Sequence, residues 1–151
     1  YLVKPIMVED LVSALARVMH SGAAPLRDVV IIDPDQAYAA ALGEALNNAY
    51  RCSVRMCRTG IDGLEAILSQ RPDAVVMELD LSDMDGYGLL VSMRSQDTMR
   101  DIPVIILTAR ELPVEQLDLL GRQATFYVNK LSGDGQQLVD VLPTVLSGMS
   151  R

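Results

Sequence analysis

Residues 72–86 read PDAVVMELDLSDMDG. The apolar run at 74–77 is typical of a short strand that is buried on both faces of a sheet. Glu78 ends this run with a carboxylate, and a polar loop leads to Asp85-Gly86, where the next helix is expected to begin. The stretch therefore predicts a buried strand whose carboxyl end carries an acidic side chain.

The same alternation of strand and helix continues on both sides of this stretch. Further strands are predicted at 29–32, 52–57, 104–107 and 125–128, the second of them more exposed than the others. Helices are predicted at 36–48, around 61–68, at 86–95 and at 112–120, and a last one begins near Asp134 and is ended early by Pro143. This pattern predicts an α/β fold of the flavodoxin-like (βα)5 type, a three-layer sandwich with a parallel sheet in the order 2-1-3-4-5.

Two acidic residues follow strands that are neighbours in this predicted sheet. Asp33 follows the strand at 29–32, and Glu78 follows the strand at 74–77. Ligands of such sheets bind at the carboxyl ends of the strands, where two neighbouring strands part. Asp33 and Glu78 are therefore expected to lie together in the candidate functional site.

The composition excludes several classes of partner. The chain has 151 residues, half of them hydrophobic, and a formal net charge of −7. An acidic domain is repelled by phosphate backbones, so we expect no direct nucleic-acid binding and no binding to anionic membranes. No apolar run approaches the roughly 20 residues of a membrane span. We expect Cys52 and Cys57 to be unpaired thiols, as in the cytoplasm.

Residues 28 to about 147 resemble the receiver domain of two-component response regulators, the CheY-like family. The resemblance rests on an acidic motif at Asp33-Pro34-Asp35, on Glu78, and on three residues near the last two strands: Thr108, Tyr127 and Lys130. It implies a signalling module rather than an enzyme. It also implies that position 78 is the phosphoacceptor, that Thr108 and Lys130 contact the phosphoryl group, and that Tyr127 is the switch aromatic residue.

Several residues depart from the pattern of that family. The phosphoacceptor position carries glutamate in place of aspartate, and Pro34 replaces an acid that binds Mg²⁺ directly. Leu131 replaces a proline beside Lys130, and Ser82 replaces a loop proline. We therefore expect a degenerate pseudo-receiver with no cofactor. If Mg²⁺ binds at all, it binds weakly, through Asp33 and Glu78.

The chemistry of individual acids leaves alternatives open. The longer carboxylate of Glu78 could contact Lys130 and Thr108 without a metal, in an arrangement like the active state, or Glu78 could simply fill a decayed site. Asp35 is expected to cap the helix at 36–48 rather than to bind metal. Asp80 and Asp83 are expected to be solvated loop acids.

The first residues of the chain have a pattern of their own. Apolar residues from Val8 to Met19 recur at helical spacing, which predicts an extra N-terminal helix. Tyr1 and Lys4 have the same spacing as Tyr127 and Lys130. We interpret residues 1–20 as the end of a preceding receiver domain, 21–27 as a linker, and 28–148 as a complete receiver-like domain.

The leading hypothesis is a cytoplasmic receiver module of a tandem-receiver response regulator that acts through protein contacts. Its expected partners are its own tandem receiver or output domain, a histidine kinase or regulator, and possibly a second copy. These contacts would use the face formed by the helix at 112–120, the strand at 125–128 and the last helix. The alternatives are an active Mg²⁺-dependent phosphoacceptor with an altered site, using Asp80 or Glu78, and a flavodoxin-like domain that binds a small ligand.

Overall fold

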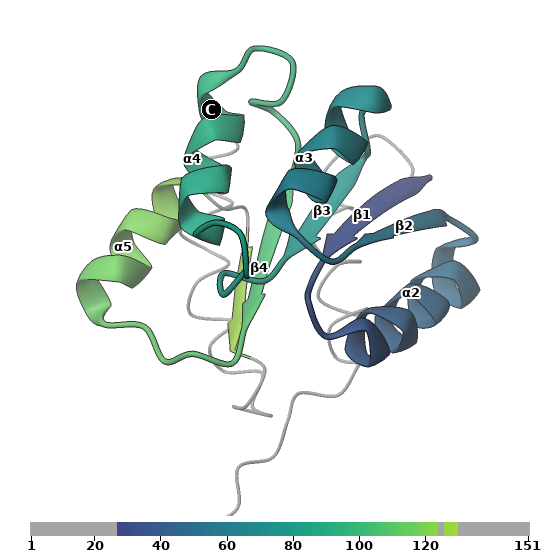
Figure 1. Cartoon of the computed structure of the whole chain (residues 1–151), viewed down its shortest axis with the longest axis horizontal. Helices are drawn as coiled ribbons and strands as arrows, with labels where there is room; N and C mark the ends of the chain where they lie inside the picture. Colours follow the sequence, from purple (N-terminus) through teal and green to yellow (C-terminus); the bar gives the residue numbers. More distant parts are fainter. Residues whose placement is uncertain (1–26, 124–125, 130–151) are drawn as a thin grey trace, which may run out of the picture.

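The computed structural model describes residues 27–123 and 126–129. Its parallel strands form one sheet in the order β2-β1-β3-β4-β5 (Figure 1). The strands are β1 (Asp28–Ile32), β2 (Ser53–Cys57), β3 (Ala74–Met77), β4 (Val104–Thr108) and β5 (Phe126–Asn129). This order confirms the fold class and the strand order that the sequence predicts.

Helices cover both faces of the sheet. They are α2 (Gln36–Tyr50), α3 (Gly60–Ser69), α4 (Gly86–Ser95) and α5 (Val114–Gln123), labelled as in Figure 1. A Cβ atom at Gly43 of α2 would lie 3.1 Å from Val54 Cγ1 on β2, and one at Gly63 of α3 would lie 2.3 Å from Ile32 Cδ1 on β1. Side chains two apart on a strand share a face, so Val54, whose partner in β1 is Val29, and Ile32 point to opposite faces. The helices α2 and α3 therefore pack on opposite sides of the sheet.

The core is aliphatic, as the composition predicts. Every residue of β1, β3 and β4 is buried, whereas β2 at the edge of the sheet is partly exposed. Residues of α3, α4 and α5 join one hydrophobic cluster with the strands, represented by Ile67, Leu90 and Leu120. The two cysteines, Cys52 and Cys57, are buried free thiols, which confirms that they are unpaired.

The helix predicted at 112–120 begins and ends later than predicted. It runs from Val114 to Gln123. Pro113 precedes it, and the proline ring disfavours helical geometry at the preceding residue, Leu112. Leu112 instead packs against the hydrophobic cluster from the loop.

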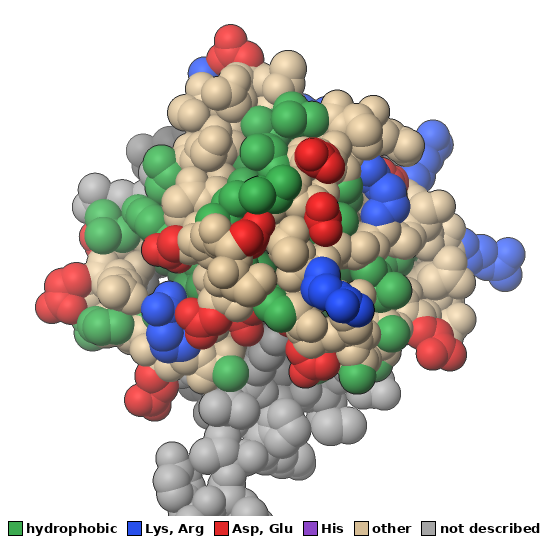
Figure 2. All heavy atoms as spheres, in the orientation of Figure 1, with side chains coloured by type: hydrophobic (Ala, Val, Ile, Leu, Met, Phe, Trp, Pro, Cys, Tyr) green, Lys and Arg blue, Asp and Glu red, His purple; other side chains and the backbone are tan. Residues whose placement is uncertain are grey.

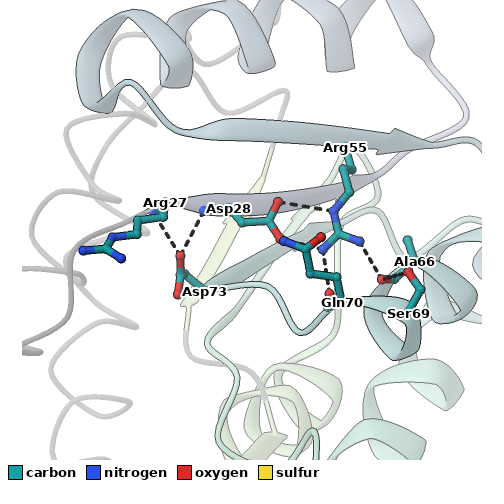
Figure 3. A network of polar contacts seen from close by, with 7 residues as sticks. All are labelled: Arg27, Asp28, Arg55, Ala66, Ser69, Gln70 and Asp73. Atoms are coloured by element: carbon teal, nitrogen blue, oxygen red, sulfur yellow. Dashed lines mark hydrogen bonds and ion pairs between the residues drawn. The ribbon is translucent and has the colours of Figure 1, made fainter.

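A polar network ties β1 and β2 to the end of α3 (Figure 3). From the middle of β2, the guanidinium of Arg55 donates to both carboxylate oxygens of Asp28, at the start of β1, at 3.2 and 2.6 Å. It also donates to the carbonyl oxygens of Ala66 at 2.6 Å and Gln70 at 2.7 Å. The Ala66 carbonyl also accepts from the amide of Gln70. A cation is favourable at the C-terminal end of a helix, so Arg55 complements the negative end of α3.

Some predictions lie outside the described residues. These are the N-terminal helix, the linker up to residue 26, the last helix from Asp134 to Pro143, and the loop at Leu131. Among the helices that the structure describes, none combines the length and the apolar character needed to cross a bilayer.

Candidate functional site

Asp33 and Glu78 lie side by side at the carboxyl ends of β1 and β3. Ile32 and Met77 are partners in the parallel ladder, so the next residues of the two strands are neighbours. The amide of Glu78 also donates to the carbonyl oxygen of Ile32 at 2.9 Å. Both acids are buried, with 4% of Asp33 and 7% of Glu78 exposed. The fold therefore brings together the two acids that the sequence singles out.

Backbone amides hold both carboxylates. Glu78 Oε2 accepts from the amide of Leu79 at 2.7 Å and from the amide of Asp80 at 3.3 Å. Asp33 Oδ1 accepts from the amide of Asp35 at 2.9 Å. The carboxylate of Glu78 thus folds back onto the start of its own loop.

The residues after Asp33 direct the chain into α2. Asp35 is the N-cap of that helix, and its Oδ1 accepts from the amide of Tyr38 at 3.1 Å, which confirms the predicted capping role. Pro34 is exposed and lines a cleft of about 580 Å³ together with the loop at 79–85 and Arg110. A proline side chain has no oxygen, so this wall of the cleft offers no carboxylate at position 34.

Tyr38 places a phenol close to the acids. Its pKa is raised to about 12, first because the ring is buried and then because of the negative charges of Asp33, Asp35 and Glu78. Tyr38 lies in the first turn of α2, one turn after the cap. It therefore stays protonated over the physiological range. Tyr38 was not predicted as a site residue from the sequence; its position in the first turn of the helix after Asp33 is the signal that could have identified it.

Thr108 ends β4 next to the same edge of the sheet. It is fully buried, and its Oγ1 accepts from the amide of Arg110 at 3.3 Å. The guanidinium of Arg110 lies 3.5 Å from a carboxylate oxygen of Asp80. Arg110 therefore links the loop after β4 to the loop after β3 across the mouth of the cleft. Both side chains are about half exposed, so this ion pair is weak on its own.

Asp83 connects the same loop to α3. Its two carboxylate oxygens accept from the amides of Gly60 and Ile61, each at 2.9 Å. These hydrogen bonds, first from Ile61 and then from Gly60, lower the pKa of the Asp83 carboxyl group. The residue is exposed, as predicted for a solvated loop acid, but it also caps a helix that is distant in sequence.

The end of the loop is packed tightly against its start. Asp85 caps α4, and its Oδ1 accepts from the amide of Tyr87 at 3.0 Å. A Cβ atom at Gly86 would lie 2.7 Å from the carbonyl oxygen of Glu78 and 2.8 Å from Leu79 Cα. Only glycine allows this close backbone approach. The loop at 78–85 is thus fixed at both ends and joined to α3 and to the loop after β4.

Two of the predicted site residues are described only in part or not at all. Tyr127 lies in β5, where it is the partner of Ile106 in the ladder. Its side chain and the whole of Lys130 lie outside the described residues. The contact between Glu78 and Lys130 and the switch role of Tyr127 therefore remain predictions. Within residues 27–123 and 126–129, no three His, Cys, Asp or Glu side chains are grouped as metal ligands.

Known proteins resemble this chain over the part that forms the sheet. Residues 29–142 match the family model of the response regulator receiver domain. The response regulator MprA of Mycobacterium sp. strain KMS is 34% identical over 107 residues, which are 70% of this chain and 44% of that protein. This chain therefore spans less than half the length of that relative.

Solved structures give the same result. A putative response regulator from Chloroflexus aurantiacus J-10-fl is 27% identical with a TM-score of 0.64, over 82% of this chain and 99% of that one. The N-terminal domain of a response regulator receiver protein from Methanoculleus marisnigri JR1 is 25% identical with a TM-score of 0.64, over 80% of this chain and 96% of that one. With the acids at the ends of β1 and β3, these matches identify the chain as a member of the response regulator receiver domain family.

Proposed function

We propose that this domain is a pseudo-receiver, a signalling module that acts by protein contact and does not accept a phosphoryl group in the ordinary way. The observation that carries the proposal is the pair of acids at the strand ends. Glu78 holds its carboxylate against the amides of Leu79 and Asp80, and Pro34 supplies no ligand beside it. Asp33 is the other acid of the site, and its Oδ1 accepts from the amide of Asp35.

The donor set fits a magnesium ion poorly. Mg²⁺ takes near-octahedral oxygen ligands at about 2.1 Å, usually one or two carboxylates together with waters and phosphate oxygens. Here Pro34 supplies no carboxylate, and Glu78 directs Oε2 at the amides of Leu79 and Asp80. Phosphoryl transfer depends on such a cation to neutralise the gathered oxygens. The residues present therefore favour a site that holds its shape without metal.

Backbone amides can take over part of that role for a single carboxylate. Two N–H groups directed at Glu78 Oε2 stabilise one negative charge, whereas a phosphoryl group carries about −1.5 to −2. The loop at 78–85 is thus held by a residue that is always present, rather than by a modification. A contact between Glu78 and Lys130 would distinguish an arrangement like the active state from a decayed site.

We further propose that residues 1–20 are the end of a preceding receiver, 21–27 a linker and 28–148 the complete domain of a tandem-receiver protein. The support is the repeated spacing of Tyr1 and Lys4 in Tyr127 and Lys130. The partners of this domain would be its own tandem receiver or output domain, or a histidine kinase, in the cytoplasm.

The deciding experiment compares matched variants for phosphorylation. The wild-type chain, Glu78→Asp, Pro34→Asp and the double variant are incubated with a small phosphodonor and Mg²⁺, and intact mass is measured. We expect no adduct on the wild type and an acid-stable, base-labile adduct on the double variant. The double variant should gain more than the two single variants together, because both changes act on one metal site.

A stoichiometric, Mg²⁺-dependent adduct on the wild-type chain would overturn the proposal. Asp80→Asn then assigns the adduct, since it removes Asp80 as acceptor and leaves Glu78 in place. If the double variant also stays unmodified while it folds and binds Mg²⁺, decay of these two positions is not the cause. The cause of the missing phosphorylation then lies elsewhere in the site.

A further inference from the structure

A groove between α4 and α5 lies next to the acidic cleft formed by Pro34, the loop at 79–85 and Arg110. The lining of the groove has a different character. The groove has a volume of about 220 Å³. Its lining is mainly apolar and comes from both helices and the two loops that precede them: Leu79, Asp85, Tyr87, Arg110, Leu112, Gln116, Leu119 and Leu120. Leu79, Asp85 and Arg110 also line the acidic cleft, so the two depressions share a wall.

The groove is too small for most cofactors and large enough for an anchoring side chain. Pockets that hold drug-sized ligands have volumes of about 300–1,000 Å³. Partner helices commonly bind by placing one or a few apolar side chains in a depression of this kind. Leu119 lines the groove and is 46% exposed, so apolar surface is available there.

Acidic side chains lie beside this apolar surface. Glu111 precedes the lining residue Leu112, and Glu115 lies one turn before Leu119 on α5; both are exposed. Asp85 lines the groove itself, and among the lining residues Arg110 carries the single positive charge, close to Asp80. Figure 2 shows acidic and hydrophobic side chains over α5, on the left of the view, with a basic side chain beside them. Among the described side chains, these three acids outnumber Arg110, so they complement a cationic partner.

We propose that the groove between α4 and α5 binds a basic amphipathic helix of a partner protein. One or two aliphatic side chains of that helix fill the groove, and its lysine or arginine side chains face Glu111 and Glu115. This surface differs from the predicted face that includes β5 and the last helix, because it lies on the α4 side of α5. The inference rests on the proposed function, contact with a protein, and names the kind of partner.

The position of the groove gives such a partner access to the site. Arg110 contacts Asp80 and, through its amide, Thr108, and it also lines the groove. Leu79, whose amide holds Glu78, lines the groove as well. A bound helix therefore touches the residues that set the position of the loops around the acidic cleft.

The test uses a fluorescent synthetic peptide of about 18 residues, long enough for partial helicity in water. It carries leucine at positions i, i+3, i+4 and i+7 of each repeat and lysine at the others. Two matched peptides replace lysine by glutamate or leucine by alanine. Binding to the full chain is measured by fluorescence anisotropy at physiological salt, and only the leucine–lysine peptide is expected to bind.

Matched variants locate the site. Leu119→Ser and Glu115→Lys change the groove, whereas Leu68→Ser and Glu65→Lys make the same changes on α3, where Leu68 is 61% exposed and Glu65 is exposed too. Leu119→Ser is expected to raise the dissociation constant about tenfold, because it removes an aliphatic contact with the peptide. Glu115→Lys is expected to raise the dissociation constant several-fold, and by less at high salt. The two α3 variants should bind like the wild type.

Equal weakening by the groove and α3 variants would overturn the proposal, as would equal binding of the glutamate peptide or no binding of the leucine–lysine peptide. Circular dichroism shows whether each variant is folded. If Leu119→Ser is unfolded, Gln116→Trp blocks the groove from an exposed position and replaces it. The phosphorylation assay tests the state of the acidic site and this assay tests the groove, so either can fail alone.

Discussion

Replacing Arg55 by alanine tests the network that joins β1, β2 and the end of α3. Arg55 donates two hydrogen bonds to Asp28 and one each to the carbonyl oxygens of Ala66 and Gln70. Its removal leaves a carboxylate that is only 11% exposed without this partner, and it uncovers the end of α3. Arg55→Ala therefore acts on β1, β2 and α3 together.

The expected loss of stability follows from the burial of the pair. Breaking a buried ion pair costs about 3–5 kcal/mol, because one charge remains buried without its partner. The Arg55 side chain is 27% exposed, so water replaces part of what is lost. We expect the free energy of unfolding to fall by about 2–4 kcal/mol. With a urea m-value of about 2 kcal/mol per M, the midpoint falls by roughly 1–2 M.

The measurement is equilibrium urea unfolding followed by circular dichroism. Arg100→Ala is the matched control, because Arg100 is 58% exposed and contacts an exposed Asp97. The control should change the free energy of unfolding by less than about 0.5 kcal/mol. A double-mutant cycle with Asp28→Ala isolates the coupling between the two side chains. If Arg55→Ala and Arg100→Ala have equal stability, the network does not contribute as argued.

Three further predictions concern other parts of the molecule. Gly86→Ala should destabilise the fold by about 1–3 kcal/mol, because its Cβ would meet the backbone of Glu78 and Leu79. Gly88→Ala, with nothing within 4 Å of its Cβ, should stabilise the fold by about 0.5–1 kcal/mol. Urea unfolding measures both variants, and a Gly86→Ala variant that is more stable than Gly88→Ala would contradict the packing described for Gly86. The lowered pKa of Asp83 implies stability that is present at neutral pH and lost as pH falls through its folded pKa. Asp83→Asn should thus have a smaller free energy of unfolding than the wild type at pH 7, and the difference should disappear in acid. A difference that does not depend on pH would show that the ionised carboxylate is not its cause. Tyr38 has a pKa of about 12 against the ordinary value of 10.0, so its contribution is full below pH 10 and is lost as pH rises toward 12. Tyr38→Phe should remove the latest step in the spectrophotometric tyrosine titration, and an unchanged profile would disprove the assignment.

The sequence predicts the sheet well because its strands are continuous apolar runs with polar ends. Residues 29–32, 74–77 and 104–107 all lie in strands whose residues are buried throughout. The end of β3 also determines where Glu78 lies. The start of α5 was less well predicted, because Leu112 fits the helical spacing although Pro113 prevents a helical conformation there.

The site is only partly predictable, because its contacts join residues that are far apart in the chain. The capping role of Asp35 is local and follows from its position before a helix. Asp83 caps a helix that begins more than twenty residues earlier, and Arg110 reaches Asp80 from the next loop. No periodicity or spacing in the sequence carries such information. The fold of the loop at 78–85 is needed to see that its acids have defined partners.

The network around Arg55 and the two buried acids lie at opposite ends of the same sheet. Asp28, at the start of β1, is joined through Arg55 in the middle of β2 to the end of α3, whereas Asp33 and Glu78 follow the carboxyl ends of β1 and β3. The proposed loss of phosphate chemistry at residues 34 and 78 therefore lies away from the contacts that anchor α3. A receiver that lost this chemistry could keep its scaffold and serve as a constant adaptor in place of a transient signal.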